Sequence, residues 1–169
     1  MIRIGVIGPE STGKSTLCRQ LSEQYGYRWV KEYAREYVEA LSRPYTYDDV
    51  LCIARRQISE LQAAYPEQVV LYDTELIITK VWMQHVYQKV APEVEQAIRT
   101  QPIDLYLILA PDLPAEPDPV RENIDKREYF HEWYIREVEA TQRPYVIIQG
   151  TGEERTRAAY KAIQTFIRQ

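Results

Sequence analysis

Short apolar runs alternate with longer amphipathic segments along this chain. The apolar runs predict strands over residues 2–7, 28–30, 68–72, 104–109 and 145–149. Apolar residues at three- and four-residue spacing predict helices over residues 14–25, 33–42, 47–64, 75–89, 92–100, 131–140 and 153–168. Strands that alternate with helices in this way are typical of a parallel sheet with helices on both faces. We therefore predict a three-layer α/β fold built on a five-stranded parallel sheet.

A complete phosphate-binding motif lies between the first predicted strand and the first predicted helix. Residues 8–15 read Gly-Pro-Glu-Ser-Thr-Gly-Lys-Ser and match G-x-x-x-x-G-K-[ST]. Glycines let the backbone approach phosphate, while N–H groups at the helix start point at the anion. Lys14 supplies a charge for the β- and γ-phosphates, and the Ser15 hydroxyl suits Mg²⁺. The residues predicted to bind ATP here are Gly8, Glu10, Ser11, Thr12, Gly13, Lys14, Ser15 and Thr16.

A chance glycine-rich turn is the alternative to a P-loop, and the flanking strand and helix argue against it. The motif predicts ATP and Mg²⁺ as cofactors in a P-loop NTPase or kinase fold. By itself it does not separate kinases from GTPases or ATP-driven switches. No N-K-x-D guanine motif is present, and Asp73 is followed by Thr-Glu-Leu rather than by the D-x-x-G of GTPases.

Length and composition agree with one globular domain over residues 1–169. The formal net charge of -4 gives no basic footprint, so we expect no nucleic-acid partner. No apolar run has membrane-spanning length, and the chain enters a strand at once, so we expect neither a membrane partner nor a signal peptide. Cys18 and Cys52 have no metal-ligand spacing, which favours reduced thiols in a cytoplasmic protein.

The segment 111–130 interrupts the alternation. It contains four prolines, which disfavour both a helix and a central strand, and these are followed by Arg121, Lys126 and Arg127. Long loops inside compact domains are usually functional, and P-loop kinases carry a mobile lid after the fourth strand. We predict a lid whose Arg121 and Arg127 close on the transferring phosphoryl group as catalytic residues. A proline-stiffened surface loop with solvated charges is the alternative.

A carboxylate ends the third predicted strand, where Val69-Val70-Leu71-Tyr72 is followed by Asp73. In P-loop proteins an aspartate at this place holds the Mg²⁺ shell. In small-molecule kinases it alternatively accepts the proton of the attacking hydroxyl. The alternative is that Asp73 or Thr74 serves only as the N-cap of the helix predicted over 75–89. We predict Asp73 as a catalytic, metal-binding and substrate-binding residue.

Other polar residues lie where the predicted sheet would open onto a ligand. Glu32 and Arg35 follow the second strand, and loops at the carboxyl ends of parallel strands face the ligand crevice. Gln57 interrupts an otherwise apolar helical stripe, so its amide needs either a backbone or a ligand partner. Thr151 lies between two glycines after the fifth strand, where an adenine-binding turn is expected.

Four segments together carry a resemblance to a known family. They are Gly-Pro-Glu-Ser-Thr-Gly-Lys-Ser-Thr-Leu at 8–17, Glu-Tyr-Ala-Arg-Glu-Tyr at 32–37, Tyr-Asp-Thr-Glu at 72–75 and the proline-rich stretch 111–121. In these segments the chain resembles the ribosylnicotinamide kinase domain of NadR-type proteins. The resemblance implies transfer of the ATP γ-phosphoryl group to the ribose 5′-hydroxyl of nicotinamide riboside, which gives nicotinamide mononucleotide.

The resemblance also assigns residues to the acceptor side. It implies that Glu32, Tyr33 and Arg35 line the substrate, that Asp73 faces the attacking hydroxyl, and that an aromatic residue near position 115 packs on the nicotinamide ring. This chain has Ala115 there. We therefore expect another aromatic residue to cover the ring, with Tyr33, Tyr37 and Trp133 as candidates.

The motifs thus predict Mg-ATP-dependent phosphorylation of a small hydroxyl substrate, and the resemblance implies that this substrate is nicotinamide riboside. The alternatives are a kinase for another nucleoside and an ATP-binding switch or partner-binding module that hydrolyses ATP slowly. Oligomeric state is not predicted.

Overall fold

The computed structural model describes residues 1–100, 103–120 and 122–168, and in them five parallel strands form one sheet. The strand order β2-β3-β1-β4-β5 confirms the predicted α/β fold with a five-stranded parallel sheet. The strands are β1 (Ile2–Ile7), β2 (Arg28–Val30), β3 (Val69–Asp73), β4 (Leu105–Leu109) and β5 (Tyr145–Ile148). Their bounds differ from the predicted ones by a single residue at most at either end.

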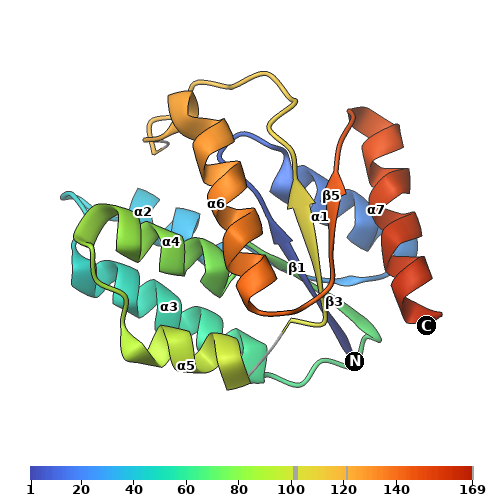
Figure 1. Ribbon diagram of the computed structural model, residues 1–169, viewed down its shortest axis with the longest axis horizontal. Helices are drawn as coiled ribbons and strands as arrows, with labels where there is room; N and C mark the ends of the chain where they lie inside the picture. Colours follow the sequence, from blue (N-terminus) through green and yellow to red (C-terminus); the bar gives the residue numbers. More distant parts are fainter. Residues whose placement is uncertain (101–102, 121, 169) are drawn as a thin grey trace.

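Helices cover both faces of the sheet, which gives three layers (Figure 1). The helices α1 and α7 lie on one face, and α3, α4, α5 and α6 lie on the other. The helices of the described residues are α1 (Lys14–Tyr25), α2 (Tyr33–Glu39), α3 (Tyr47–Gln62), α4 (Leu76–Tyr87), α5 (Pro92–Thr100), α6 (Arg127–Ala140) and α7 (Gly152–Ile167). A short 3₁₀ helix over Ile124–Lys126 leads into α6.

The apolar runs are strands because both faces of the sheet are buried. Along β3, Leu71 packs into the cluster under α1 and α7, while Val70 and Tyr72 pack into the cluster under α3 to α6. Every residue of β3 and β4 is buried, as expected for a parallel sheet with helices on both faces.

Strand order also decides which loops meet. β1 pairs with β3, with Val6 opposite Asp73, so the segment that follows β1 lies beside the carboxyl end of β3. Since β1 lies between β3 and β4 in the sheet, the segment that follows β4 reaches the same edge. Ligands of open α/β sheets bind at such a crevice.

Two helix starts bear on the predicted site. α6 begins at Arg127 rather than at 131, so the irregular part of the predicted lid is shorter than 111–130. The N-cap of α4 is Glu75, whose side chain accepts a hydrogen bond from the Ile77 N–H at 2.9 Å. The pure-cap alternative for Asp73 or Thr74 is therefore wrong.

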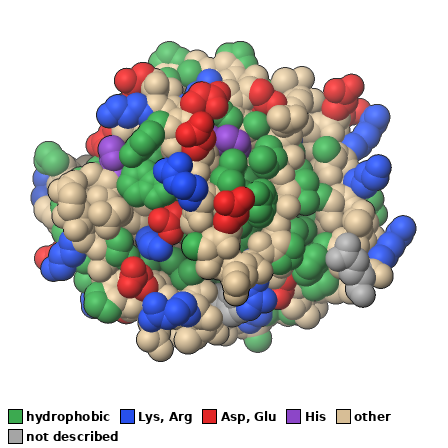
Figure 2. All heavy atoms as spheres, in the orientation of Figure 1, with side chains coloured by type: hydrophobic (Ala, Val, Ile, Leu, Met, Phe, Trp, Pro, Cys, Tyr) green, Lys and Arg blue, Asp and Glu red, His purple; other side chains and the backbone are tan. Residues whose placement is uncertain are grey.

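Acidic and basic side chains are interspersed over the face shown in Figure 2. No helix in the described ranges is both long and apolar enough to span a membrane.

Candidate active site

The loop between β1 and α1 has the geometry that its glycines permit. Gly8 has φ +152°, and a Cβ there would lie 2.8 Å from the Leu109 carbonyl oxygen of β4. Gly13 is left-handed, with φ 77°, and immediately precedes the first turn of α1. Both positions would be strained with any side chain. The loop therefore presents backbone at the N-terminus of α1, where the helix dipole favours an anion.

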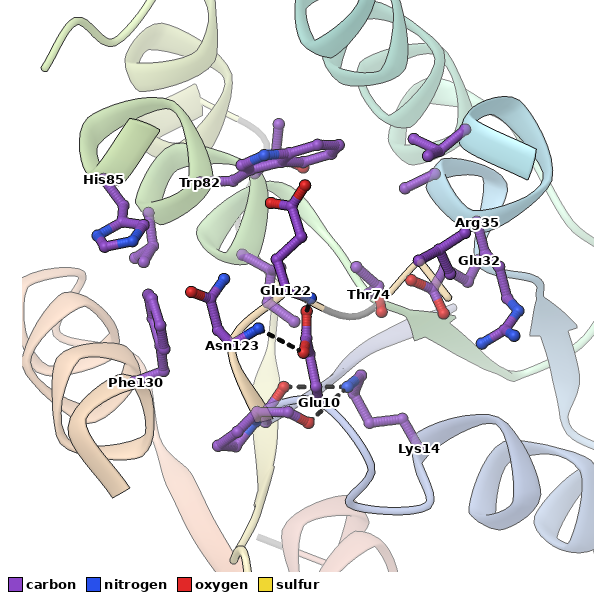
Figure 3. Close-up of a pocket in the computed structure, with 18 of the residues that line it drawn as sticks. Glu10, Lys14, Glu32, Arg35, Thr74, Trp82, His85, Glu122, Asn123 and Phe130 are labelled. Atoms are coloured by element: carbon purple, nitrogen blue, oxygen red, sulfur yellow. Dashed lines mark hydrogen bonds between the residues drawn. The ribbon is translucent and has the colours of Figure 1, made fainter. Parts of the chain in front are cut away.

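The loop is held by its own side chains. Thr12 Oγ1 donates to the Pro9 carbonyl at 2.8 Å. The Lys14 ammonium donates to the carbonyls of Gly8 at 3.0 Å and Pro9 at 2.9 Å, which keeps its charge at the mouth of the loop (Figure 3).

Asp73 lies directly behind the exposed Ser15 at the start of α1. Asp73 Oδ2 accepts from Ser15 Oγ at 2.6 Å and from Trp29 Nε1 at 3.3 Å. The side chain is almost completely buried, and this burial raises the pKa of Asp73, although the hydrogen bond from Ser15 and the charge of Lys14 oppose the shift. Asp73 Oδ1 is buried without a hydrogen-bond partner among the described residues.

A hydroxyl and a carboxylate in this arrangement fit Mg²⁺. Mg²⁺ is typically held by one or two protein oxygens and takes its other ligands from phosphates and water. Ser15 Oγ and the unpartnered Asp73 Oδ1 provide such oxygens beside the phosphate loop. In the described part of the chain no group of three or more His, Cys, Asp or Glu side chains forms a separate metal site.

The segment after β4 lies over the phosphate loop. Ser11 Oγ accepts from the Glu116 N–H at 2.9 Å, and the Arg127 guanidinium donates to the Ser11 carbonyl at 3.3 Å. The Glu10 carboxylate accepts from the N–H groups of Glu122 at 3.2 Å and Asn123 at 3.0 Å (Figure 3). The predicted lid thus contacts the residues that it was expected to cover. Arg121 lies outside the described residues.

The same segment is bonded to α2 and to the loop that follows it. Arg35 of α2 forms an ion pair with Asp118 at 2.6 Å, which raises the pKa of this arginine. The Tyr45 hydroxyl donates to the Glu122 carboxylate at 2.7 Å. Arg35, predicted as a substrate ligand, therefore binds the lid through Asp118 in this structure.

A cavity of about 180 Å³ lies between the phosphate loop, the lid and the helices α2, α4 and α6. One end holds Lys14 and Glu10, and the other end is aromatic, with Trp82 and Phe130 (Figure 3). Its wall consists of Gly8, Pro9, Glu10, Ser11, Lys14, Glu32, Ala34, Arg35, Val38, Tyr45, Thr74, Ile78, Thr79, Val81, Trp82, His85, Val120, Glu122, Asn123, Phe130 and Tyr134.

The predicted substrate residues divide into two groups. Glu32 and Arg35 are part of the cavity wall. Tyr33 is not, and its ring packs edge-on against Tyr37. Gln57 is buried away from the main cavity: its amide donates to the Thr74 carbonyl at 3.2 Å, and its oxygen accepts from Thr79 Oγ1 at 2.6 Å. The polar Gln57 on its apolar helical stripe is thus explained by hydrogen bonds within the protein.

Thr151 and the candidate ring partners lie outside the cavity wall as well. Thr151 is exposed at the N-cap position of α7. The Tyr37 hydroxyl donates to Asp49, and the Trp133 indole N–H donates to Glu137. None of the three candidate ring partners, Tyr33, Tyr37 and Trp133, therefore belongs to the wall of this cavity.

The residues that form the aromatic end were not singled out from the sequence. Ile78, Trp82 and His85 recur at helical spacing on α4, which is a readable signal. An apolar stripe at this spacing predicts core packing just as well. No sequence pattern predicts that Glu122 and Asn123 line the cavity, because their position depends on the path of the lid.

The fold and this site define a nucleotide-binding protein with a P-loop kinase-like fold. A model of the AAA domain family matches residues 3–155, and the chain belongs to that family. It also resembles the kinase domain of NadR, as its sequence motifs indicated.

The trifunctional NAD biosynthesis/regulator protein NadR of Escherichia coli K12 is 24% identical over 135 residues. The match includes 75% of this chain and 33% of that protein, so the chain spans about a third of the length of this relative.

Solved structures show the same fold. The crystal structure of NadR in complex with NR has a TM-score of 0.79 at 24% identity and covers 96% of this chain and 50% of that chain. NadR in complex with NAD and AMP-PNP has a TM-score of 0.80 at 26% identity and covers 96% and 48%. Deoxyadenosine kinase from M. mycoides has a TM-score of 0.68 at 13% identity and covers 97% and 100%.

Proposed function

We propose that this protein transfers the γ-phosphoryl group of Mg-ATP to the ribose 5′-hydroxyl of nicotinamide riboside and so makes nicotinamide mononucleotide for NAD salvage. The P-loop, the resemblance to NadR, and the NadR structures with NR and with AMP-PNP support this assignment. The reaction needs one site for phosphates and one for a nucleoside, at opposite ends of a single cleft.

The choice of nucleoside rests on the residues at the aromatic end of the cavity, which we call the acceptor end. Nicotinamide riboside bears a positive charge on its ring. The cavity presents the rings of Trp82, Phe130 and Tyr134 together with the Glu122 carboxylate, which points toward Trp82 in Figure 3. Aromatic faces and carboxylates both attract a cationic ring, and an uncharged base would gain less from either.

Positioning and charge stabilisation supply most of the catalysis, because phosphoryl transfer needs little covalent chemistry from the protein. Lys14 and the loop N–H groups hold the phosphates, and Ser15 with Asp73 would hold Mg²⁺, which neutralises the phosphate oxygens. Arg127, and Arg121 from the lid, would stabilise the charge of the transferring group. The 5′-oxygen forms the new bond to γ-phosphorus as the bond to the ADP oxygen breaks.

Glu32 is better placed than Asp73 to accept the proton of the 5′-hydroxyl. Glu32 belongs to the cavity wall, whereas Asp73 lies behind Ser15 and outside that wall. We assign the proton to the Glu32 carboxylate and the metal to Asp73. A Glu32→Gln variant is expected to lose kcat while keeping the KM for ATP.

A turnover panel tests the function. The purified chain is assayed with Mg-ATP and, separately, nicotinamide riboside, uridine, cytidine, adenosine and deoxyadenosine, with mass detection of the phosphorylated product. We expect the highest kcat/KM for nicotinamide riboside. A higher value for another nucleoside would overturn the substrate assignment. ATP hydrolysis without transfer to any nucleoside would favour the ATP-binding switch instead.

Glu122→Gln provides the matched variant for the charge argument. It keeps the shape and the oxygen that accepts from Tyr45 but removes the negative charge. We expect kcat/KM to fall for nicotinamide riboside and to change little for any uncharged nucleoside that the wild type accepts. An equal fall for both would remove the charge argument.

A further inference from the structure

The backbone turns sharply between β3 and α4, at a residue type that rarely makes such a turn. Thr74 has φ 67°, in the left-handed region. Branching at Cβ makes this region unfavourable for threonine, and such outliers persist only where the surroundings impose them. The strain lies between Asp73, which is bonded to Ser15, and Glu75, which caps α4.

A buried network of hydrogen bonds imposes this conformation. The Thr74 N–H donates to the Val6 carbonyl at 3.1 Å, and the Thr74 carbonyl accepts from the Gln57 amide at 3.2 Å. The Gln57 oxygen in turn accepts from Thr79 Oγ1 at 2.6 Å. Gln57 is therefore held at both ends of its amide, and both backbone polar groups of Thr74 are bonded.

The Thr74 side chain is the part of this turn that the network leaves out. Thr74 is only 7% exposed, and its Oγ1 has no hydrogen-bond partner within the described ranges. A buried hydroxyl without a partner is costly and calls for an explanation. Because the residue forms part of the cavity wall, one rotamer step about Cα–Cβ exchanges the hydroxyl with another substituent of Cβ.

The place of Thr74 in the cavity indicates which part of a ligand it meets. In Figure 3 it lies between Lys14, at the phosphate end, and Trp82, at the aromatic end. A nucleoside with its base at Trp82 and its 5′-oxygen toward Lys14 has its sugar in between.

We propose that the Thr74 hydroxyl hydrogen-bonds a ribose hydroxyl of the acceptor nucleoside, and that Gln57 is the positioning residue that holds Thr74 for this contact. The proposal rests on the proposed function, because it names the sugar contact of the same site. A contact with the sugar would explain both the strained backbone of Thr74 and its hydroxyl without a partner among the described residues.

Thr74→Val and Thr74→Ser test the contact. Valine keeps the branched shape and loses the hydroxyl, whereas serine keeps the hydroxyl. We expect valine to raise the KM for the nucleoside about 5-fold or more, with the KM for ATP within about twofold of wild type, and serine to stay near wild type. If Thr74→Val does not fold, Thr74→Ala makes the same comparison. An unchanged nucleoside KM, or an equal rise for ATP, would overturn the proposal.

Deoxy analogues of the accepted nucleoside separate a direct contact from a structural effect. Wild type should discriminate against the 2′-deoxy or the 3′-deoxy form, and Thr74→Val should lose about 5-fold or more of that discrimination. Equal discrimination in both proteins against both analogues would mean that Thr74 does not contact the sugar.

Gln57→Leu and Thr156→Val complete the set. Gln57→Leu should raise the nucleoside KM as Thr74→Val does. Thr156 is also buried, and its hydroxyl donates to Gln20 on the other face of the sheet, so Thr156→Val should lower the melting temperature without changing the nucleoside KM. A wild type that phosphorylates no nucleoside would remove both proposals. An active wild type with an unaltered Thr74→Val would remove only this one.

Discussion

The two ends of the cleft are built in different ways. The phosphate end consists of one contiguous segment, residues 8–15, plus Asp73 from the neighbouring strand, and its ligand groups are largely backbone. The acceptor end draws side chains from α2, α4, the lid and α6, over a span of the chain from Glu32 to Tyr134. One end is fixed by local geometry and the other by the packing of several elements.

Because of this difference, the phosphate end can serve the shared chemistry while the acceptor end sets the specificity. A phosphate loop has the same task in every P-loop protein, so a short motif suffices. Under the proposed function the acceptor end must fit one nucleoside among many, and side chains on helices and on a lid can change without disturbing the loop. The solved relatives, a NadR and a deoxyadenosine kinase, share the fold and differ in the nucleosides named for them.

Removing Lys14 should have the largest effect, because it destroys the phosphate end alone. We expect Lys14→Ala to reduce kcat by about 10²-fold or more. Its melting temperature should stay near that of wild type, since the side chain fills no core position. Lys161→Ala, at an exposed lysine on α7, is the control and should have normal turnover. Near-normal activity of Lys14→Ala would mean that the loop is not the active site.

Asp73→Asn should nearly match that loss and leave stability intact. Asparagine keeps an oxygen that accepts from Ser15 and Trp29 but removes a charge whose burial raises the pKa of Asp73. We expect kcat to fall about 10²-fold while the melting temperature is unchanged or higher. Steady-state kinetics and thermal unfolding on one preparation check both. An unaltered kcat would contradict metal binding by Asp73.

Trp82→Leu should damage only the acceptor end. We expect the nucleoside KM to rise about 10-fold, as the loss of an aromatic contact with a cationic ring implies, with an unchanged KM for ATP. Trp133→Leu is the matched control, because Trp133 packs on Phe130 outside the cavity wall. It should affect stability more than the nucleoside KM. Equal rises in the nucleoside KM for the two substitutions would contradict a specific contact between Trp82 and the nucleoside.

Glu75 is buried at the N-cap of α4, and its effect should appear in stability rather than in turnover. Burial raises the pKa of Glu75 from 4.5 to about 8. Between these values the folded protein binds the proton more tightly than the unfolded chain does. The free energy of unfolding therefore falls as the pH rises from about 4.5 to about 8.

Glu75→Gln keeps an oxygen for the Ile77 N–H and should remove this slope. We expect the variant to melt roughly 4 °C or more above wild type at alkaline pH, with a smaller difference in acid. Thermal unfolding between about pH 5 and pH 9 measures it. Parallel pH profiles for both proteins would show that Glu75 does not carry the dependence.

Several features of this protein could be predicted from the sequence, because they depend on neighbouring residues. The P-loop is encoded by eight consecutive residues, the strands by continuous apolar runs and the helices by an apolar period of 3.6. The capping box of Thr46 and Asp49 at the start of α3 is likewise local, since its two residues lie three positions apart. The resemblance to NadR rested on such segments. The start of α6 was misplaced because its first turn, Arg-Glu-Tyr-Phe, looks like the end of a charged loop.

Only the tertiary structure decided which side chains face the ligand. Trp82 and Trp133 are both aromatic residues on amphipathic helices, yet one lines the cavity and the other packs outside it. Gln57 and Glu32 are both polar residues that the sequence offered as ligand contacts. Gln57 instead bonds to Thr74 and Thr79, while Glu32 is part of the cavity wall. Periodicity gives the direction of a side chain relative to its own helix. What lies in that direction depends on how distant elements pack, and local sequence does not specify it.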